Sequence, residues 1–229
     1  LNDFNIKSKL VYDENKNKAN LFATIGEDSK GGIVLSGHTD VVPTKNQKWS
    51  SDPFTLTERD NKLFGRGSSD MKGFIAVVLS RISKMVETKL NKPIHLAFSY
   101  DEEIGCVGVH GLLDLIEKKS INPEFCIVGE PTSMEVVIGH KGKHAYDVKV
   151  DGYSCHSGQA PYGVNAINYA AKLISYIEEL NKEKSKIGPF DNEYEIPYST
   201  LSTGIINGGT ILNIVPVSYT HLTLPTKVE

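Results

Sequence analysis

The sequence predicts an α/β domain followed by a smaller α+β domain. Short apolar runs such as Ile33–Leu35 are typical of buried strands, and they alternate with stretches whose apolar residues repeat at helical spacing. After Gly139 the pattern changes to strand, helix, strand and strand with short links. We therefore expect a first domain over residues 1–139 and a second over residues 140–216.

Strands dominate the beginning of the chain. We expect them at Lys9–Tyr12, Asn20–Ile25 and Gly31–Gly37, where apolar and β-branched residues gather between turn-forming residues. Residues 45–60 are predicted to form a loop around Trp49, the only tryptophan.

A helix, a strand, a second helix and another strand follow. Apolar residues repeat at helical spacing over Ile75–Val86, which predicts the first helix. Strands are expected at Ile94–Tyr100 and Glu124–Val128, with a helix over residues 108–118 between them. His95 lies inside the first of these strands, where we expect a structural role.

The second domain is predicted from a different order of elements. Lys143–Asp151 alternates as a strand does, and residues 152–163 form a loop. Val164–Leu180 carries apolar residues on one helical face, and strands are expected at Thr200–Ile206 and Ile211–Val215. This plan is that of a small α+β domain.

Composition argues against several classes of protein. The chain has 229 residues, of which 39% are hydrophobic and 23% are charged, and its net charge is −3. This slight acidity argues against nucleic-acid and membrane-surface partners, and no apolar run approaches the ~20 residues of a membrane span. Three scattered cysteines argue for a reducing compartment. Since no secretory signal opens the chain, we expect a cytoplasmic protein.

The first candidate site residue is His38, at the end of a predicted strand. Asp40 lies two residues on, on the same face of an extended chain. A metal-bound histidine needs its second ring N–H held, usually by a carboxylate, and a His-x-Asp pair supplies both parts. Taken alone, a histidine at such a place is more often simply hydrogen-bonded within the protein.

Acidic residues stand at the ends of further elements. Asp70 precedes the first predicted helix, where an N-cap is the simpler interpretation. Asp101, Glu102 and Glu103 follow a strand, either as a solvated turn or as a set in which one carboxylate binds metal while its neighbour moves protons. Glu130 follows another strand. Because ligand sites form where the carboxyl ends of strands meet, convergence of these residues on one sheet edge predicts a functional site.

Four segments resemble the motifs of a known family, in its order and at its spacing. They are similar to those of the co-catalytic zinc hydrolases, which include deacetylases, desuccinylases, aminoacylases and carboxypeptidases, and the similarity covers residues 20–216. The resemblance implies an incomplete, mixed-sheet, zinc-peptidase-like catalytic domain over residues 1–139 and a smaller α+β dimerisation or lid domain over residues 140–216. The segments are Ser-Gly-His38-Thr-Asp40-Val-Val-Pro, Gly-Arg-Gly-Ser-Ser-Asp70-Met-Lys-Gly, Asp-Glu102-Glu103-Ile-Gly and Gly-Glu130-Pro-Thr.

Within this family, three stretches lean towards the acetylornithine deacetylases. The reaction implied is hydrolysis of N-acetylornithine to ornithine and acetate, a step of arginine biosynthesis. Succinyl-diaminopimelate desuccinylases and related aminoacylases and carboxypeptidases are the alternatives within the family. A catalytically inactive metal-binding or dimerising fragment is the alternative from another class. The stretches are Trp49-Ser-Ser-Asp-Pro-Phe54, Asp70-Met-Lys-Gly-Phe74 and His140-Lys141-Gly142.

The resemblance also implies a set of metal ligands. His38 and Glu130 are expected to bind one zinc ion, Asp70 to bridge both ions, and Glu103 to bind the second. A complete site would hold two zinc ions, for which Co²⁺ is a possible substitute. Nitrogen and oxygen ligands without a thiolate suit a catalytic zinc site, in which a position stays open for water.

The remaining expected roles concern the substrate. Glu102 would be the general base, and Asp40 would orient the metal-binding histidine. His156, on the lid domain, would reach the active site of a partner subunit and contact the scissile carbonyl, and Asn213 would help to bind substrate. The resemblance thus implies a homodimer formed through the lid domain and a small-molecule N-acyl amino acid as substrate, with no nucleic acid and no membrane as partners.

The chain departs from the family in two places. The family has a further histidine ligand for the second zinc ion in a C-terminal segment, and this chain ends before that segment. After Pro216 the family continues towards a substrate-binding arginine, whereas residues 217–229 do not match the family, and we expect this tail to be foreign to the fold. The histidines to which we assign no ligand role are His110, His140, His144 and His221.

Overall fold

A computed structural model describes residues 1–27 and 31–219 of the chain. The chain divides into two compact units, Leu1–Val136 and Val137–Glu229, and each is described by itself. The first unit contains the expected catalytic residues and the second contains His156 and Asn213. None of the helices in the described ranges is both long and apolar enough to cross a membrane.

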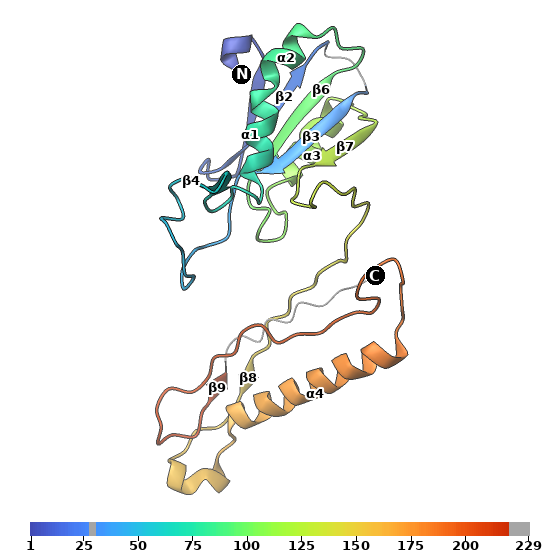
Figure 1. Cartoon of the computed structure of the whole chain (residues 1–229). Helices are drawn as coiled ribbons and strands as arrows, with labels where there is room; N and C mark the ends of the chain where they lie inside the picture. Colours follow the sequence, from blue (N-terminus) through green and yellow to red (C-terminus); the bar gives the residue numbers. More distant parts are fainter. Residues whose placement is uncertain (28–30, 220–229) are drawn as a thin grey trace. The chain divides into compact units, whose positions relative to one another are not determined.

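A five-stranded mixed sheet forms the centre of the first unit (Figure 1). Its strands are β1 (Ser8–Tyr12), β2 (Ala19–Ile25), β3 (Ile33–His38), β6 (Ile94–Ser99) and β7 (Phe125–Val128). In the spatial order β1-β2-β6-β3-β7, β2 is antiparallel to both of its neighbours, whereas β3 is parallel to β6 and to β7. The mixed sheet is thus confirmed, and each of its strands lies within two residues of the predicted bounds.

Helices cover both faces of this sheet. Alternate residues of a strand point to opposite faces, so Phe22 and Ala23 belong to different apolar clusters. Ala23 packs in the cluster that α1 (Lys72–Ser80) and α2 (Ile82–Glu87) complete, and Phe22 packs in the one that α3 (His110–Lys118) completes (Figure 1). The sheet is therefore the middle of three layers.

The single helix predicted from the apolar repeat is divided into two. Arg81 donates its N–H to the carbonyl of Val78, three residues back, where an α-helix would use the fourth residue. Apolar spacing does not report this change in hydrogen bonding, since Val78 and Ile82 lie in the same cluster on either side of the break.

Part of the predicted loop over residues 45–60 is a strand. β4 (Thr57–Arg59) pairs with β5 (Lys62–Phe64) as a two-stranded hairpin. Asp60 and Asn61 both have positive φ, 53° and 56°, which is the backbone of a two-residue hairpin turn. The Asp-Asn pair was the available sequence signal for this turn.

The second unit contains one long helix and little sheet. Its elements are β8 (Val150–Asp151), the short 3₁₀ helix η2 (Ser157–Tyr162), α4 (Ala166–Ile187) and β9 (Ser218–Tyr219). The first unit also begins with a 3₁₀ turn, η1 (Asn2–Phe4). β8 and β9 pair antiparallel, so two residues of the segment expected to be foreign take part in this two-stranded sheet. Residues 220–229 of that segment, which include His221, lie outside the described residues.

The strands predicted for the second unit are largely wrong. Only the last two residues of the expected strand Lys143–Asp151 form a strand, whereas His144 and Asp147 make isolated bridges. In place of strands over residues 200–206 and 211–215, the structure has isolated pairings such as that of His156 with Ile214. Alternating side chains make a strand possible, but a strand forms only where a neighbouring backbone pairs along its length.

Candidate metal centre

The strand register of the sheet brings His38 and Glu130 to the same edge. β3 and β7 run parallel with Ser36 opposite Val128, so the positions two residues further on lie side by side. Those positions are His38, the last residue of β3, and Glu130, just beyond β7. His38 is only 2% exposed, whereas Glu130 lies at the surface of the site with 36% of its side chain exposed.

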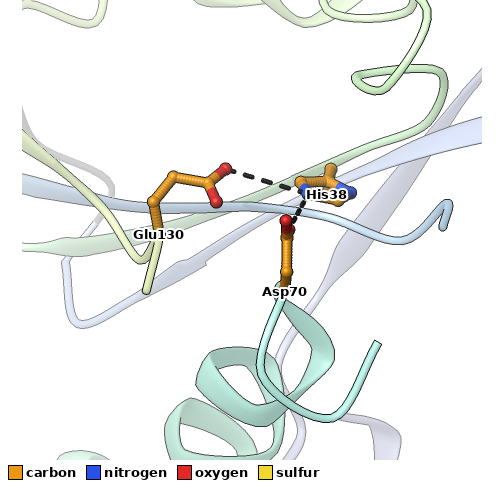
Figure 2. Close-up of side chains that lie close together, drawn as sticks. All are labelled: His38, Asp70 and Glu130. Atoms are coloured by element: carbon orange, nitrogen blue, oxygen red, sulfur yellow. Dashed lines mark hydrogen bonds and ion pairs between the residues drawn. The ribbon is translucent and has the colours of Figure 1, made fainter. Parts of the chain in front are cut away.

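Two carboxylates, those of Asp70 and Glu130, converge on one ring nitrogen of His38 (Figure 2). Its Nε2 lies 2.9 Å from Oδ1 of Asp70 and 3.8 Å from Oε1 of Glu130. The ligand atoms of these three residues all lie within 4.8 Å of one another. Within residues 1–27 and 31–219, no other group of three histidine, cysteine or acidic side chains comes as close.

Asp70 does not cap the helix that follows it. The N-cap of α1 is Met71, which makes no side-chain capping bond, and the Asp70 carboxylate turns to His38 instead. The N-cap interpretation of Asp70 is therefore wrong. An aspartate one residue before a cap position has the same sequence signal as a capping one, so only the position of His38 separates the two.

Asp40 holds the histidine ring from the other side. Nδ1 of His38 lies 2.9 Å from the backbone carbonyl of Asp40 and 3.4 Å from its carboxylate. The two carboxylate oxygens accept the N–H groups of Glu102 and Glu103, each at 3.1 Å. One residue thus fixes the orientation of the ring with its carbonyl and the position of the acidic loop with its carboxylate.

Glu102 and Glu103 are placed differently. Oε2 of Glu102 lies 3.8 Å from Nε2 of His38, at the same distance as the nearest oxygen of Glu130. Glu103 is tied to the site through its backbone N–H, and its side chain is not one of the three clustered groups. The structure therefore brings His38, Asp70 and Glu130 together in one cluster. Glu103, the fourth expected metal ligand, lies in the acidic loop that Asp40 holds next to this cluster.

The surroundings shift the pKa values of three groups in the site, His38, Asp40 and Glu130. Burial would lower the pKa of His38, but the hydrogen bonds to the Asp70 carboxylate and to the Asp40 carbonyl, with the negative charges of Asp40 and Glu130, raise it above its ordinary value. Burial would raise the pKa of Asp40, but the backbone N–H groups of Glu103, Glu102 and Asp40, with the charge of His38, together lower it below its ordinary value. Burial and the charge of Asp70 raise the pKa of Glu130. A cluster with this excess of negative charge attracts a cation.

His156 and Asn213 lie together in the second unit. The N–H of Ser157 donates to the carbonyl of Asn213 at 2.9 Å, and His156 pairs with Ile214 as an isolated bridge. Nδ1 of His156 accepts the N–H of Gly158 at 3.1 Å, so the ring proton is on Nε2, and the side chain is exposed. His156 can therefore donate a hydrogen bond to a ligand.

Two sulfur atoms lie beside the site, in residues for which the sequence predicted no role there. Sδ of Met71 accepts the backbone N–H of His38 at 3.2 Å, and Met71 is completely buried. Sγ of Cys106 donates to Oε1 of Glu102 at 3.4 Å. The one available signal was proximity in the chain, since Met71 follows Asp70 and Cys106 lies four residues after Glu102.

Residues 34–198 match peptidase family M20/M25/M40. The chain belongs to this family. Two curated M20-like relatives are acetylornithine deacetylases: that of Pectobacterium carotovorum is 41% identical and that of Shigella sonnei is 39% identical, each over 198 residues. These matches cover 86% of this chain and 50% of each relative. The chain thus spans about half the length of the curated relatives it matches.

Solved structures of M20 proteins show the same fold. An M20 family metallo-carboxypeptidase from Sulfolobus solfataricus superposes with a TM-score of 0.73 at 23% identity, covering 98% of this chain and 62% of the other. A tripeptidase from Staphylococcus aureus superposes with a TM-score of 0.63 at 20% identity, covering 98% of this chain and 57% of the other. The predicted zinc-peptidase-like fold class is confirmed.

The residues present fit the divalent metal that an M20 metallopeptidase implies. His38 offers an imidazole nitrogen, Asp70 and Glu130 offer carboxylate oxygens, and no thiolate enters the cluster. This donor set, with its net negative charge, suits a catalytic divalent ion that keeps an open position. The carbonyl of Asp40 on the second ring nitrogen is the partner that metal-binding histidines use.

Proposed function

We propose that this chain supplies the metal site of an amide hydrolase that removes the acyl group from an N-acyl amino acid. The observation that carries the proposal is the cluster of His38, Asp70 and Glu130, with Glu102 3.8 Å from the same ring nitrogen. Metal ligands and a carboxylate that can move protons are the two components such a hydrolysis requires.

Zinc is the metal that we propose for this site. His38, Asp70 and Glu130 would hold one ion, and Glu103 would contribute to a second in the complete protein, with Co²⁺ as a possible substitute. When bound, zinc supplies a Lewis acid and lowers the pKa of water at the site. The support is the donor set and the family, whose members are metal-dependent.

Glu102 is the residue that we assign to proton transfer. Its carboxylate would take a proton from the attacking water and later deliver it to the leaving amine. Its backbone is fixed by Asp40 and its side chain is 37% exposed, so it can reach both solvent and substrate.

His156 and Asn213 are assigned to the substrate. The exposed Nε2–H of His156 would donate to the developing oxyanion of the scissile carbonyl, and Asn213 would bind substrate beside it. We propose that His156 acts in the active site of a partner subunit, in a homodimer formed through the second unit. The hydrogen bond between Ser157 and Asn213 keeps His156, the neighbour of Ser157 in the chain, close to Asn213. This supports a shared role of His156 and Asn213 in substrate binding.

N-acetylornithine is the substrate that we propose, with ornithine and acetate as products. The two curated relatives that are 39–41% identical are acetylornithine deacetylases, which supports this choice and with it a cytoplasmic role in arginine biosynthesis.

Turnover in the complete protein that contains this chain tests the proposal. We expect N-acetylornithine to be hydrolysed faster than N-succinyl-diaminopimelate, and Glu102→Gln to abolish turnover while the metal content is kept. Faster turnover of the succinyl compound would replace the substrate with that of the desuccinylases. Full activity of Glu102→Gln would remove Glu102 from its role.

A further inference from the structure

The loop between β6 and α3 carries Glu102 and Glu103 and is closed at its base. Its two ends, Tyr100 and Gly108, touch each other: a Cβ added to Gly108 would lie 1.9 Å from the carbonyl oxygen of Tyr100. Only a glycine allows this approach. The position of Glu102 relative to His38 therefore depends on what holds these ends together.

Asn20, on the neighbouring strand β2, joins both ends of this loop. Its side-chain amide donates from Nδ2 to the carbonyl of Gly108 at 2.8 Å and accepts the N–H of Tyr100 on Oδ1 at 3.2 Å. Asn20 is 1% exposed, so water does not replace these bonds if the amide is removed. One buried amide thus satisfies a donor and an acceptor eight residues apart in the chain.

Two other contacts fix the same loop at different points. Lys18, two residues before Asn20 and on the same side of the extended chain, binds both oxygens of Asp101 at 2.8 and 2.6 Å. The Asp40 carboxylate accepts the N–H groups of Glu102 and Glu103. The Lys18 side chain is 49% exposed, so its ion pair is screened by solvent, and the buried amide is the stronger constraint at the base.

We propose that Asn20 is a positioning residue for Glu102. Without its amide, the N–H of Tyr100 and the carbonyl of Gly108 would be buried and unpaired, which favours opening of the loop towards water. Opening would displace Glu102 from His38 although both residues remain in the chain. The fixed loop places the Glu102 carboxylate 3.8 Å from the ring nitrogen.

Amide hydrogen exchange in the metal-free 229-residue chain tests this inference without any catalysis. Asn20→Leu keeps the size of the side chain and removes both hydrogen bonds. We expect exchange in the loop to accelerate by at least about tenfold, the ratio typical for the loss of one buried hydrogen bond, while β3 and β6 keep their protection. The loop amides that donate hydrogen bonds in the structure belong to Glu102, Glu103, Gly105, Cys106 and Val107.

Thr24→Val is the matched control. Thr24 lies on the same strand and face, four residues from Asn20, and its hydroxyl bonds to Nδ1 of His95 at 3.0 Å, away from the loop. This variant loses a half-buried hydrogen bond, and we expect no selective acceleration in residues 102–107. Equal acceleration in Asn20→Leu and Thr24→Val, or unchanged loop exchange in Asn20→Leu, would overturn the inference.

A second variant covers the case in which Asn20→Leu does not fold. Asn20→Thr keeps a polar atom and introduces a residue of high strand propensity, but its hydroxyl is one bond closer to the backbone and cannot serve both partners. We expect the same selective acceleration in this variant. Native exchange of the loop in a folded Asn20→Thr protein would contradict the role of the two hydrogen bonds.

A kinetic readout in the complete protein rests on the proposed function. There we expect Asn20→Leu to lower kcat with little change in KM, because a displaced Glu102 affects proton transfer more than substrate binding. A change in KM alone would contradict the positioning role. If no N-acyl amino acid is hydrolysed by the unmodified protein, the proposed function fails, whereas the exchange result still decides the role of Asn20.

Discussion

His38 is the residue on which the metal site depends, because its two ring nitrogens face different partners. Nδ1 faces the Asp40 carbonyl, and Nε2 faces the carboxylates of Asp70, Glu102 and Glu130. In the metal-free protein, a proton on Nε2 would place a positive charge where the cation would bind. The same carboxylates therefore stabilise the protonated ring and attract the metal.

Asp70→Asn is expected to lower the pKa of His38. The hydrogen bond that the Asp70 carboxylate accepts from the ring is the first of the interactions that raise this pKa, and the amide removes the negative charge of Asp70 while keeping its shape. An NMR titration of the His38 ring in the metal-free chain measures the change. Glu178→Gln, at an exposed carboxylate of α4, is the control that should leave the His38 pKa as it is. An unaltered pKa in Asp70→Asn would show that the 2.9 Å contact contributes nothing.

The stability of the chain is expected to depend on pH in opposite directions with and without metal. Since the pKa of His38 is raised in the folded protein, its protonation stabilises the metal-free fold below the unfolded value, about 6.5. This contribution is lost as the pH rises through the folded pKa. Zinc requires the neutral ring, so its binding strengthens over the same interval.

Urea unfolding from pH 6 to pH 8, with and without zinc, measures this difference. Over this interval we expect the His38 contribution to the free energy of unfolding to fall in the metal-free chain, and the stabilisation by zinc to rise. In the His38→Asn reference variant, we expect the pH dependences measured with and without zinc to no longer differ. Parallel pH dependences of the two series in the unmodified chain would contradict the assignment of His38.

The residues of the site could be predicted from the sequence more completely than their contacts. Strand ends followed by His38, by the acidic loop and by Glu130 indicated one sheet edge, because the position of a strand's carboxyl end follows from its apolar run. The residues around Asp70 did not separate capping from metal binding, since both use the same carboxylate, and only the family resemblance placed Asp70 at the same zinc ion as His38. Asn20 gave no signal, because a buried amide that pairs with distant backbone groups is recognised only in three dimensions.

Among the elements, the loop over residues 100–108 is constrained by a close backbone approach at its base. Gly108→Ala is expected to destabilise the first unit by about 2–3 kcal/mol, because the new Cβ would meet the Tyr100 carbonyl at 1.9 Å and the backbone must shift. Urea unfolding measures the loss. Gly139→Ala is the control, since a Cβ there would meet only Oη of Tyr194, at 3.9 Å. Equal stability of the two variants would contradict the close approach.

The central strands β2, β3 and β6 of the first unit were predictable because both of their faces are buried under helices. Burial on both sides requires continuous apolar runs such as that of β3, which stand out in the sequence. In the second unit, the strands predicted over residues 200–206 and 211–215 are absent from the structure, because no long partner lies beside these described residues. The predicted end of α4 was seven residues early, since its last turns are charged and stabilised by pairs such as Glu178 with Lys182.

At the scale of the whole molecule, the two units contribute different parts of the proposed reaction. The first holds the metal cluster and Glu102, and the second holds His156 and Asn213. The match to the M20 family over residues 34–198 includes the metal cluster, Glu102 and His156 but ends before Asn213, and the chain covers half of its curated relatives. The dimer, in which one protomer would complete the site of the other, stays a proposal.

Zinc stoichiometry of the purified 229-residue chain, beside a Glu130→Ala variant, tests the central claim most directly. We expect about one tightly held zinc ion per chain, because one complete ligand cluster is formed, and its loss when the Glu130 carboxylate is removed. Leu10→Ala, at an exposed position of β1, is the control that should keep its zinc. A chain that binds no zinc, or a Glu130→Ala variant that binds it as tightly as the unmodified chain, would contradict the account.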